Sequence, residues 1–216
     1  MKKEPQYRTF KPASERKLSQ YESKKDIELW DDFRNGDDGA FVFIYKDYIQ
    51  RLYNIGRQVT NSEELVKDCL HDFFLELRSR RETLGSTDNI KLYLFKSFRR
   101  KIIKYLEKEI RFTSSDFNEY AIEFSIETKI INAQISKEQL QNLQLAISQL
   151  SKKEREIVFY FFYENMSYQE IAELLDYNHV SSARRFIYNL IKKLREHMPI
   201  VILILLQDIS SMQLHH

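Results

Sequence analysis

The last third of the chain encodes two consecutive amphipathic helices, a pattern that leaves few folds open to this segment. Ser167 and Glu170 have the spacing of a capping box, so a helix is expected to start there. A polar turn over residues 176–179 separates this helix from a second one that begins at Ser181. The apolar positions of the second helix recur at helical spacing and comprise Ala183, Phe186, Ile187, Leu190, Ile191 and Leu194.

The opposite face of the second helix is basic and rich in hydrogen-bonding groups. A helix that enters the major groove of DNA needs such a face, with a buried row behind it. We therefore expect this helix-turn-helix to bind duplex DNA. The expected contact residues are Ser181, Ser182, Arg184, Arg185, Tyr188, Asn189 and Lys192.

Composition favours helices throughout the chain. Glycine and proline are scarce, with 4 and 3 of 216 residues, and no useful stretch alternates as a strand does. The 43% of hydrophobic and 31% of charged residues fit a soluble protein. We expect an all-α fold with two small helical domains joined by a linker. The expected segments are a flexible basic arm over 1–25, a helical domain over 26–111, a linker over 112–135, a helix-turn-helix domain over 136–197 and an apolar tail over 198–216.

The first domain is expected to begin with a helix at Asp26 that has Ile27, Trp30 and Phe33 on its apolar side. The polar cluster 35–39 should end this helix. Asn61 with Glu64 suits the start of a later helix. The buried row of that helix is expected to comprise Leu65, Val66, Leu70, Phe73, Phe74 and Leu77.

Charge is unevenly distributed, although the net charge is only +2. Residues 26–76 contain 5 Lys/Arg and 12 Asp/Glu, whereas residues 78–111 contain 11 Lys/Arg and 4 Asp/Glu. An acidic block beside a basic block indicates two different partners, one of them polyanionic. Two solvated helical faces are the alternative interpretation.

A helix from about Ile90 to Ile110 lies in the basic block and interleaves cations with aromatic side chains. Rings and cations on one helix can hold single-stranded nucleic acid through stacking and phosphate contacts. Phe95 and Phe98 are expected in the core instead. The expected strand-binding residues are Tyr93, Lys96, Arg99 and Arg100.

No arrangement of residues for catalysis stands out, and an enzyme is not expected. The few glycines could hardly build a phosphate-binding loop. Cys69 and His71 lie two residues apart and would point away from each other on a helix, so no metal site is expected. No cofactor is expected either.

A cytoplasmic location without membrane insertion is expected. The single cysteine suits a reducing compartment, and no apolar stretch typical of a signal peptide follows the first residues. The apolar run over 200–206 is far shorter than the roughly 20 residues that span a bilayer. This run could pack on its own domain or serve as a docking strip for a partner.

Taken together, these segments resemble the extracytoplasmic-function (ECF) group of the sigma-70 family of bacterial transcription initiation factors. Residues 65–77 look like the helix that docks on the clamp helices of the largest polymerase subunit, and residues 89–104 like the promoter-melting helix. Residues 150–159 and 166–175 are similar to the start of region 4 of this family. The Tyr- and Lys-rich composition resembles ECF factors of Bacteroidetes-type bacteria.

The resemblance implies core RNA polymerase and promoter DNA as partners, with an anti-sigma factor as a further candidate. The helix-turn-helix would read the −35 element in the major groove. Core polymerase would contact Asp68, His71, Asp72 and Glu76. The separated strand near the −10 element would contact Asn89, Tyr93, Lys96, Arg99 and Arg100.

Departures from the family pattern keep two alternatives open. Arg100 and Lys104 stand where the melting helix commonly has Asn and Asp, and Asp176 stands where the turn commonly has glycine. A stand-alone helix-turn-helix regulator would bind duplex DNA without polymerase. A degenerate sigma-like protein would dock on polymerase without starting transcription.

Overall fold

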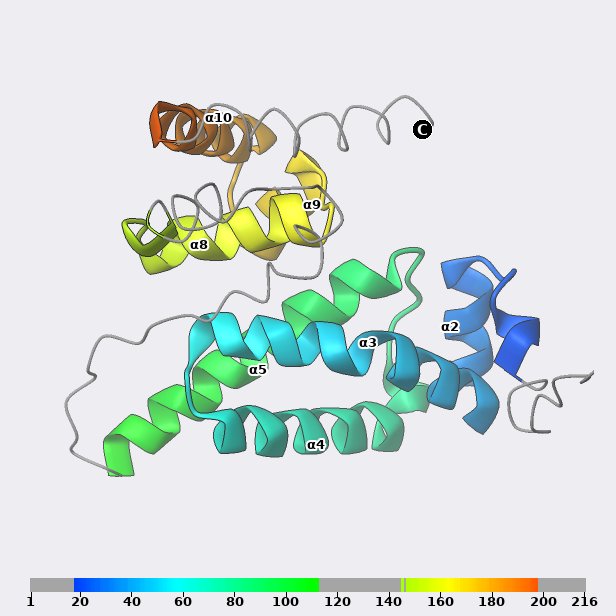
Figure 1. The fold of residues 1–216 in the computed structure, drawn as a ribbon. Helices are drawn as coiled ribbons and strands as arrows, with labels where there is room; N and C mark the ends of the chain where they lie inside the picture. Colours follow the sequence, from blue (N-terminus) through cyan, green and yellow to red (C-terminus); the bar gives the residue numbers. More distant parts are fainter. Residues whose placement is uncertain (1–17, 113–144, 146, 198–216) are drawn as a thin grey trace, which may run out of the picture. The chain divides into compact units, whose positions relative to one another are not determined.

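The computed structural model describes residues 18–112, 145 and 147–197, and every regular element within these ranges is helical (Figure 1). The expected all-α fold is therefore confirmed for this part of the chain. The domain limits proposed above stay predictions, and most of the expected arm, linker and apolar tail falls outside the described residues. None of the described helices combines the length and the apolar character that a bilayer crossing requires.

The first compact unit is built around the helices that lie between residues 18 and 101. These elements are η1 Ser19–Tyr21, α2 Asp26–Arg34, α3 Asp38–Val59, α4 Glu63–Ser79, η2 Arg81–Thr83 and α5 Ile90–Phe112. Residues 55–66 and those beyond 101 belong to the second unit, so the unit boundary runs through α3, α4 and α5. The expected break at 35–39 is confirmed, since α2 ends at Arg34 and α3 begins at Asp38.

Aromatic side chains dominate the core of the first unit. Trp30, Phe33, Phe95 and Phe98 have no exposed surface. Phe98 meets Phe73 edge-on with ring centroids 5.4 Å apart. Such pairs contribute about 0.5–1.5 kcal/mol beyond the burial of their area. Phe95 and Phe98 are thus core residues, as the sequence predicted, and α5 is fixed by its apolar side.

Two details of the predicted helices are wrong. Ile27 was expected on the apolar side of α2 but is 44% exposed, because the buried side of this short helix is formed by Leu29, Trp30 and Phe33. The expected cap of α4 at Asn61 is displaced by one residue, since Ser62 Oγ accepts the Leu65 N–H at 3.2 Å. The backbone carbonyl of Asn61 instead accepts a hydrogen bond from Arg57.

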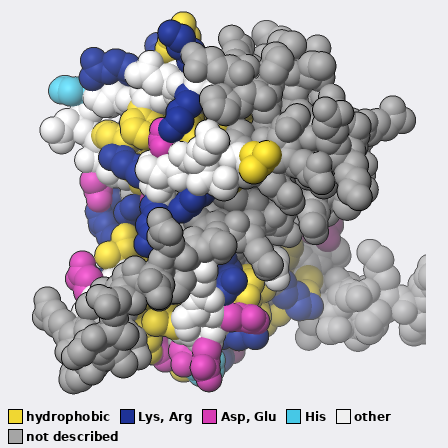
Figure 2. Space-filling model, turned by 60° about the vertical axis from the view of Figure 1, so that its left-hand side comes forward, with side chains coloured by type: hydrophobic (Ala, Val, Ile, Leu, Met, Phe, Trp, Pro, Cys, Tyr) yellow, Lys and Arg dark blue, Asp and Glu magenta, His cyan; other side chains and the backbone are white. Residues whose placement is uncertain are grey.

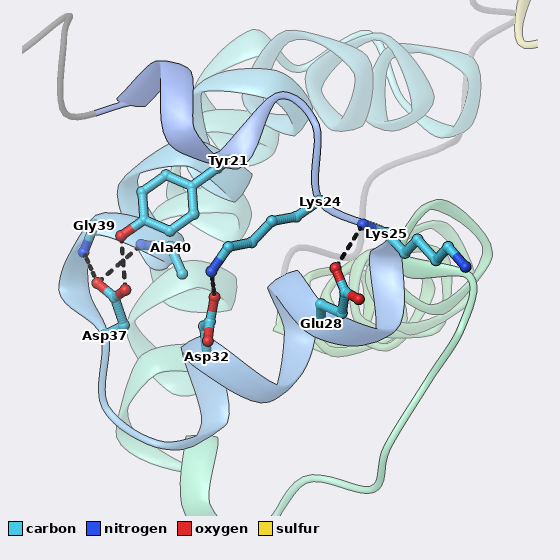
Figure 3. A network of polar contacts seen from close by, with 8 residues as sticks. All are labelled: Tyr21, Lys24, Lys25, Glu28, Asp32, Asp37, Gly39 and Ala40. Atoms are coloured by element: carbon cyan, nitrogen blue, oxygen red, sulfur yellow. Dashed lines mark hydrogen bonds and ion pairs between the residues drawn. The ribbon is translucent and has the colours of Figure 1, made fainter.

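A polar network fastens the segment before α2 to the start of α3 (Figure 3). The Tyr21 hydroxyl donates to Asp37 Oδ2 at 2.6 Å, and Asp37 Oδ1 accepts the N–H of Gly39 at 2.7 Å. Lys24 forms an ion pair with Asp32 of α2. Residues 18–25, which were predicted to belong to a flexible arm, are held by these contacts, and Tyr21 is only 3% exposed. The burial of Tyr21 was not predicted, because a single aromatic residue shows no helical periodicity in the sequence.

The second compact unit contains α8 Lys152–Val158, η3 Phe159–Tyr163, α9 Tyr168–Leu174 and α10 Val180–His197. The expected helix over 157–163 is widened into a π-helical turn at η3, in which Glu164 N–H donates to Phe159 O at 3.0 Å. Four consecutive side chains are buried there, which a regular helix with one inward face does not allow: Phe159, Tyr160, Phe161 and Phe162. The core between these helices is completed by Ile157, Ile171, Ala183, Ile187 and Leu190.

The hydrogen bond from Tyr21 is the largest cause that lowers the pKa of Asp37. Because the ionised carboxylate is favoured in the folded state, its contribution is present above the unfolded-state pKa of about 4 and is lost as the pH falls through the folded value. We expect Tyr21→Phe to lower the free energy of unfolding at neutral pH, and its difference from the native protein to shrink at about pH 3.5. Urea denaturation at both pH values measures this.

Tyr45→Phe is the matched control, because Tyr45 is 40% exposed and lies on the same helix as the Asp37 cap. Its difference from the native protein should be small and independent of pH. A Tyr21→Phe difference that persists unchanged in acid would contradict the role of Asp37.

Candidate nucleic-acid interface

A reciprocal cap fixes the start of α9, the first helix of the helix-turn-helix. The Ser167 N–H donates to Glu170 Oε2 at 2.8 Å, and the Glu170 N–H donates to Ser167 Oγ at 3.2 Å. The capping box predicted from the sequence is confirmed. It satisfies two backbone donors that would otherwise lack partners at the helix start.

The turn after α9 is closed by a Schellman motif. The Tyr177 N–H donates to Ala172 O at 2.8 Å, and the Asp176 N–H donates to Glu173 O at 3.3 Å. Asp176 has a φ of +52°, the left-handed conformation that usually selects glycine. Asp is among the few other residues that adopt it at modest cost. The turn expected over 176–179 therefore forms without glycine, and α10 starts at Val180, one residue earlier than expected.

α10 has a sharply divided surface. Its buried row comprises Ala183, Ile187, Leu190 and Leu194, while Phe186 and Ile191 are half-buried. Of the residues predicted to contact DNA, Ser182 is half-buried and the others are exposed: Ser181, Arg184, Arg185, Tyr188, Asn189 and Lys192. The structure thus brings these side chains together on one helix surface, with the core behind them.

Some cations of this unit are held by neighbouring groups. The Arg184 guanidinium lies 5.5 Å from the centre of the Tyr168 ring on α9. Lys193 Nζ lies 3.2 Å from Glu154 Oε1 at the start of α8. Burial acts to raise the pKa of Glu154, but hydrogen bonds from Ser151 and Lys193 outweigh it and the net shift is downward. These contacts tie α10 to α9 and α8.

Other side chains on α10 are not engaged in this way. No side-chain hydrogen bond, ion pair or ring contact with any other described residue is made by Ser181, Arg185, Tyr188, Asn189 or Lys192. Figure 2 shows one face of the molecule, on which Lys and Arg side chains lie among uncharged ones. Arg185 and Lys192 on the outward face of α10 therefore have no ion pair with any described residue, which suits a polyanionic partner.

The start of α5 is capped from two sides. The Ile90 N–H donates to Asp26 Oδ2 at 2.7 Å, and the Leu92 N–H donates to Asn89 Oδ1 at 2.9 Å. The Trp30 indole N–H donates to Gly85 O at 2.8 Å and anchors the loop that precedes the caps. Asn89, predicted to contact single-stranded DNA, thus has a structural role in the free protein. The anchoring by Asp26 and Trp30 was not predicted, because both residues lie far from this loop in the chain.

The remaining predicted strand-binding residues lie along α5. The Tyr93 ring packs against Trp30 with centroids 4.8 Å apart, so Tyr93 is half-buried rather than offered to a base. Lys96 and Arg99 are half-buried and Arg100 is exposed, and all three take part in further interactions within the protein. Cationic side chains line this part of α5, but the Tyr93 ring among them packs against Trp30.

The predicted polymerase-binding face lies on α4. Asp68 and His71 are exposed and make no side-chain hydrogen bond or ion pair with another described residue, while Asp72 is half-buried. Leu75, seven residues after Asp68 and hence on the same side of the helix, is 55% exposed. Leu75 was not predicted from the sequence, because it follows the buried pair Phe73 and Phe74 and looks like a further core residue there.

Glu76, also predicted to contact polymerase, is paired within the protein. Its carboxylate accepts hydrogen bonds from Lys101 Nζ at 2.7 Å and from Arg80 Nη1 at 3.1 Å. The Lys101 hydrogen bond, followed by that of Arg80, lowers the pKa of Glu76. The acidic and basic blocks of the sequence therefore neutralise each other in part, and Glu76 is a weaker candidate than Asp68.

Cys69 lies on the buried side of α4. It is fully buried, and burial raises its thiol pKa to about 11. His71 is exposed, so the two side chains point apart, as predicted from their spacing. Within the described part of the chain, no three His, Cys, Asp or Glu side chains gather as a metal site would require.

Comparisons with known proteins agree with this geometry. Residues 140–194 match the family model for sigma-70, region 4. A comparison with curated protein sequences finds no significant match.

The fold is similar to that of the sigma factor RpoE from Bartonella quintana, solved in complex with the anti-sigma factor NepR. The similarity has a TM-score of 0.52 at 17% sequence identity and covers 70% of this chain and 92% of that chain. The predicted resemblance is thus supported by sequence in the helix-turn-helix segment and by fold beyond it. The Bacteroidetes-like origin stays a prediction.

The left-handed conformation of Asp176 leads to a stability prediction. A residue with a β-carbon is disfavoured there relative to glycine by about 1 kcal/mol. We therefore expect Asp176→Gly to be more stable than Asp176→Ala by about this amount, measured by thermal or urea unfolding. Both variants lack the Asp side chain, so its contribution to stability does not enter the difference between them.

Glu173 within α9 provides the control, because helix propensity should invert the order there and make the alanine variant more stable by about 1 kcal/mol. Equal stabilities of the two Asp176 variants would show that the turn does not depend on the left-handed residue.

Proposed function

We propose that the protein is a transcription initiation factor that binds core RNA polymerase, recognises −10 and −35 promoter elements and assists promoter melting. The observation that carries the proposal is the coincidence of the region 4 match at residues 140–194 with a capped helix-turn-helix. The unengaged outward face of α10 supports it. This role requires no catalytic group of the chain's own.

In the proposed complex, α10 enters the major groove of the −35 element. The first half of such a helix contacts base edges, whereas its later residues lie nearer the phosphates. Ser181, Arg185, Tyr188 and Asn189 are assigned to the bases on this basis, and Lys192 to the backbone. Ser182 and Arg184 lie at the edge of this face, Arg184 because its guanidinium stacks on Tyr168.

The separated strand near the −10 element is assigned to α5 and the loop before it. Lys96, Arg99 and Arg100 supply positive charge for its phosphates. Asn89 and Tyr93 act in this proposal by holding the helix start and the loop, through the cap on Leu92 and the packing on Trp30. The anchored loop would keep its shape when DNA binds, which reduces the entropy lost on binding.

Core polymerase is assigned to the outward face of α4. Asp68, His71 and Asp72 supply polar contacts and Leu75 an apolar one, a combination typical of protein interfaces. The Bartonella quintana sigma factor is complexed with an anti-sigma factor. We extend this class of partner to the present chain, as a regulator that would compete with polymerase or DNA.

Arg185→Ala and Lys192→Ala should weaken promoter binding in different ways. A lost guanine contact costs about 1–3 kcal/mol, so Arg185→Ala should reduce affinity roughly 5- to 150-fold and relax the preference at one base pair. Lys192→Ala should weaken binding of all sequences alike and flatten the salt dependence by about one counterion. Titration of promoter duplexes with the polymerase complex at several salt concentrations measures both.

Lys46→Ala removes an exposed lysine from α3 and should leave promoter binding unchanged. Uniform weakening by both Arg185→Ala and Lys192→Ala, with no base preference altered, would refute the groove assignment of α10.

Asp68→Lys should weaken the binding of core polymerase without unfolding the protein, because the side chain is exposed and makes no hydrogen bond or ion pair with another described residue. Close charge pairs across interfaces are worth about 1.5 kcal/mol or more, so the expected loss is roughly tenfold or greater. Glu107→Lys makes the same charge change at an exposed site on α5 and serves as the control. Equal affinity of the two variants for core polymerase would remove the docking assignment.

A further inference from the structure

Tyr188 is the most exposed large aromatic side chain of the helix-turn-helix. Its relative exposure is 68%, and it makes no side-chain hydrogen bond or ring contact with another described residue. The other aromatic residues of this unit behave differently: Phe159, Tyr160, Phe161 and Phe162 are buried, and Tyr168 packs against Phe161 with centroids 5.3 Å apart. An aromatic ring is thus presented to solvent at a single place on α10.

The position of Tyr188 on the helix is set by the buried row. At about 100° per residue, Ala183, Ile187, Leu190 and Leu194 define the core side of α10. The opposite side is lined by Ser181, Arg185, Tyr188, Asn189 and Lys192. Tyr188 therefore stands among hydrogen-bonding and cationic groups, within the surface that the proposed function directs into the major groove.

The chemistry of the groove limits what a ring can recognise there. The edges of the base pairs in the major groove are hydrogen-bond donors and acceptors, except for the 5-methyl group of thymine. The face of a tyrosine ring offers apolar surface and no donor. Its favourable partner among the four bases is therefore the thymine methyl group.

We propose that Tyr188 reads a thymine 5-methyl group in the upstream promoter element, an inference that rests on the proposed function. Arg185 lies one turn before Tyr188, a rise of about 4.5 Å along the helix. Stacked bases are separated by about 3.4 Å, so the two side chains reach neighbouring base pairs. The recognised element accordingly has a thymine adjacent to the base pair that Arg185 contacts.

The test uses the full chain bound to core polymerase and a library of promoter duplexes randomised over the upstream element. The library is prepared once with thymine and once with uracil, which lacks only the methyl group. In the thymine library, the native protein should select a thymine at one defined position. This preference should fall about fourfold in the uracil library, the factor expected for burying one methyl-sized group.

Two variants separate the ring from the hydroxyl group. Tyr188→Ala should lose the preference at that position in the thymine library and select the same sequences from both libraries. Tyr188→Phe keeps the ring and should retain the native preference. Because the side chain is exposed, both variants should have the same unfolding temperature as the native protein.

The inference is overturned if the native protein shows the same preference at that position in the thymine and the uracil libraries. It is also overturned if Tyr188→Ala retains the preference or if Tyr188→Phe loses it. In each of these cases the proposed function is still supported if the polymerase complex transcribes from specific sequences. Failure of the native protein to select any sequence with core polymerase contradicts the proposed function, and the inference with it.

Discussion

The burial of one apolar row on α10 against α9 and its neighbours determines how the helix-turn-helix can act. Once Ala183, Ile187 and Leu190 face the core, the side chains on the opposite side of the helix must face outward. The angle between α9 and α10 depends on the capped start of α9 and on the Schellman turn around Asp176. The outward surface of α10, which we propose enters the major groove, therefore follows from core packing and backbone hydrogen bonds.

Charge in this protein is arranged by pairing as much as by clustering. The acidic stretch 26–76 and the basic stretch 78–111 look like separate binding surfaces in the sequence, yet Glu76 joins Lys101, and Asp38 accepts from both Arg78 and Arg81 at 3.1 Å. Exposed ion pairs of this kind contribute little to stability, about 0–1 kcal/mol each. These pairs neutralise part of the surface charge. Asp68 on α4 and Arg185 on α10 are outside them and are therefore the clearer candidates for contacts with other molecules.

Local signals made much of this fold predictable, whereas long-range contacts did not. The capping box at Ser167 and the break before Asp38 depend on a few neighbouring residues, and both were predicted correctly. The same holds for four members of the predicted buried row of α10, whereas Phe186 and Ile191 are half-buried. Tyr93 was predicted as a base-stacking residue because its spacing matches an exposed basic face, but its packing on Trp30 depends on a helix some sixty residues earlier. The cap that Asp26 gives to Ile90 was hidden for the same reason.

The role that we propose for this chain is to direct core RNA polymerase to promoters. The most direct measurement is transcription of a library of genomic fragments by purified bacterial core polymerase, with and without the full chain. We expect the chain to bind the core enzyme and to produce transcripts with discrete start sites that are absent without it. Sequence-specific duplex binding without binding to polymerase would contradict the account and indicate a stand-alone regulator, and binding to polymerase without new transcripts would contradict the proposed role in promoter melting.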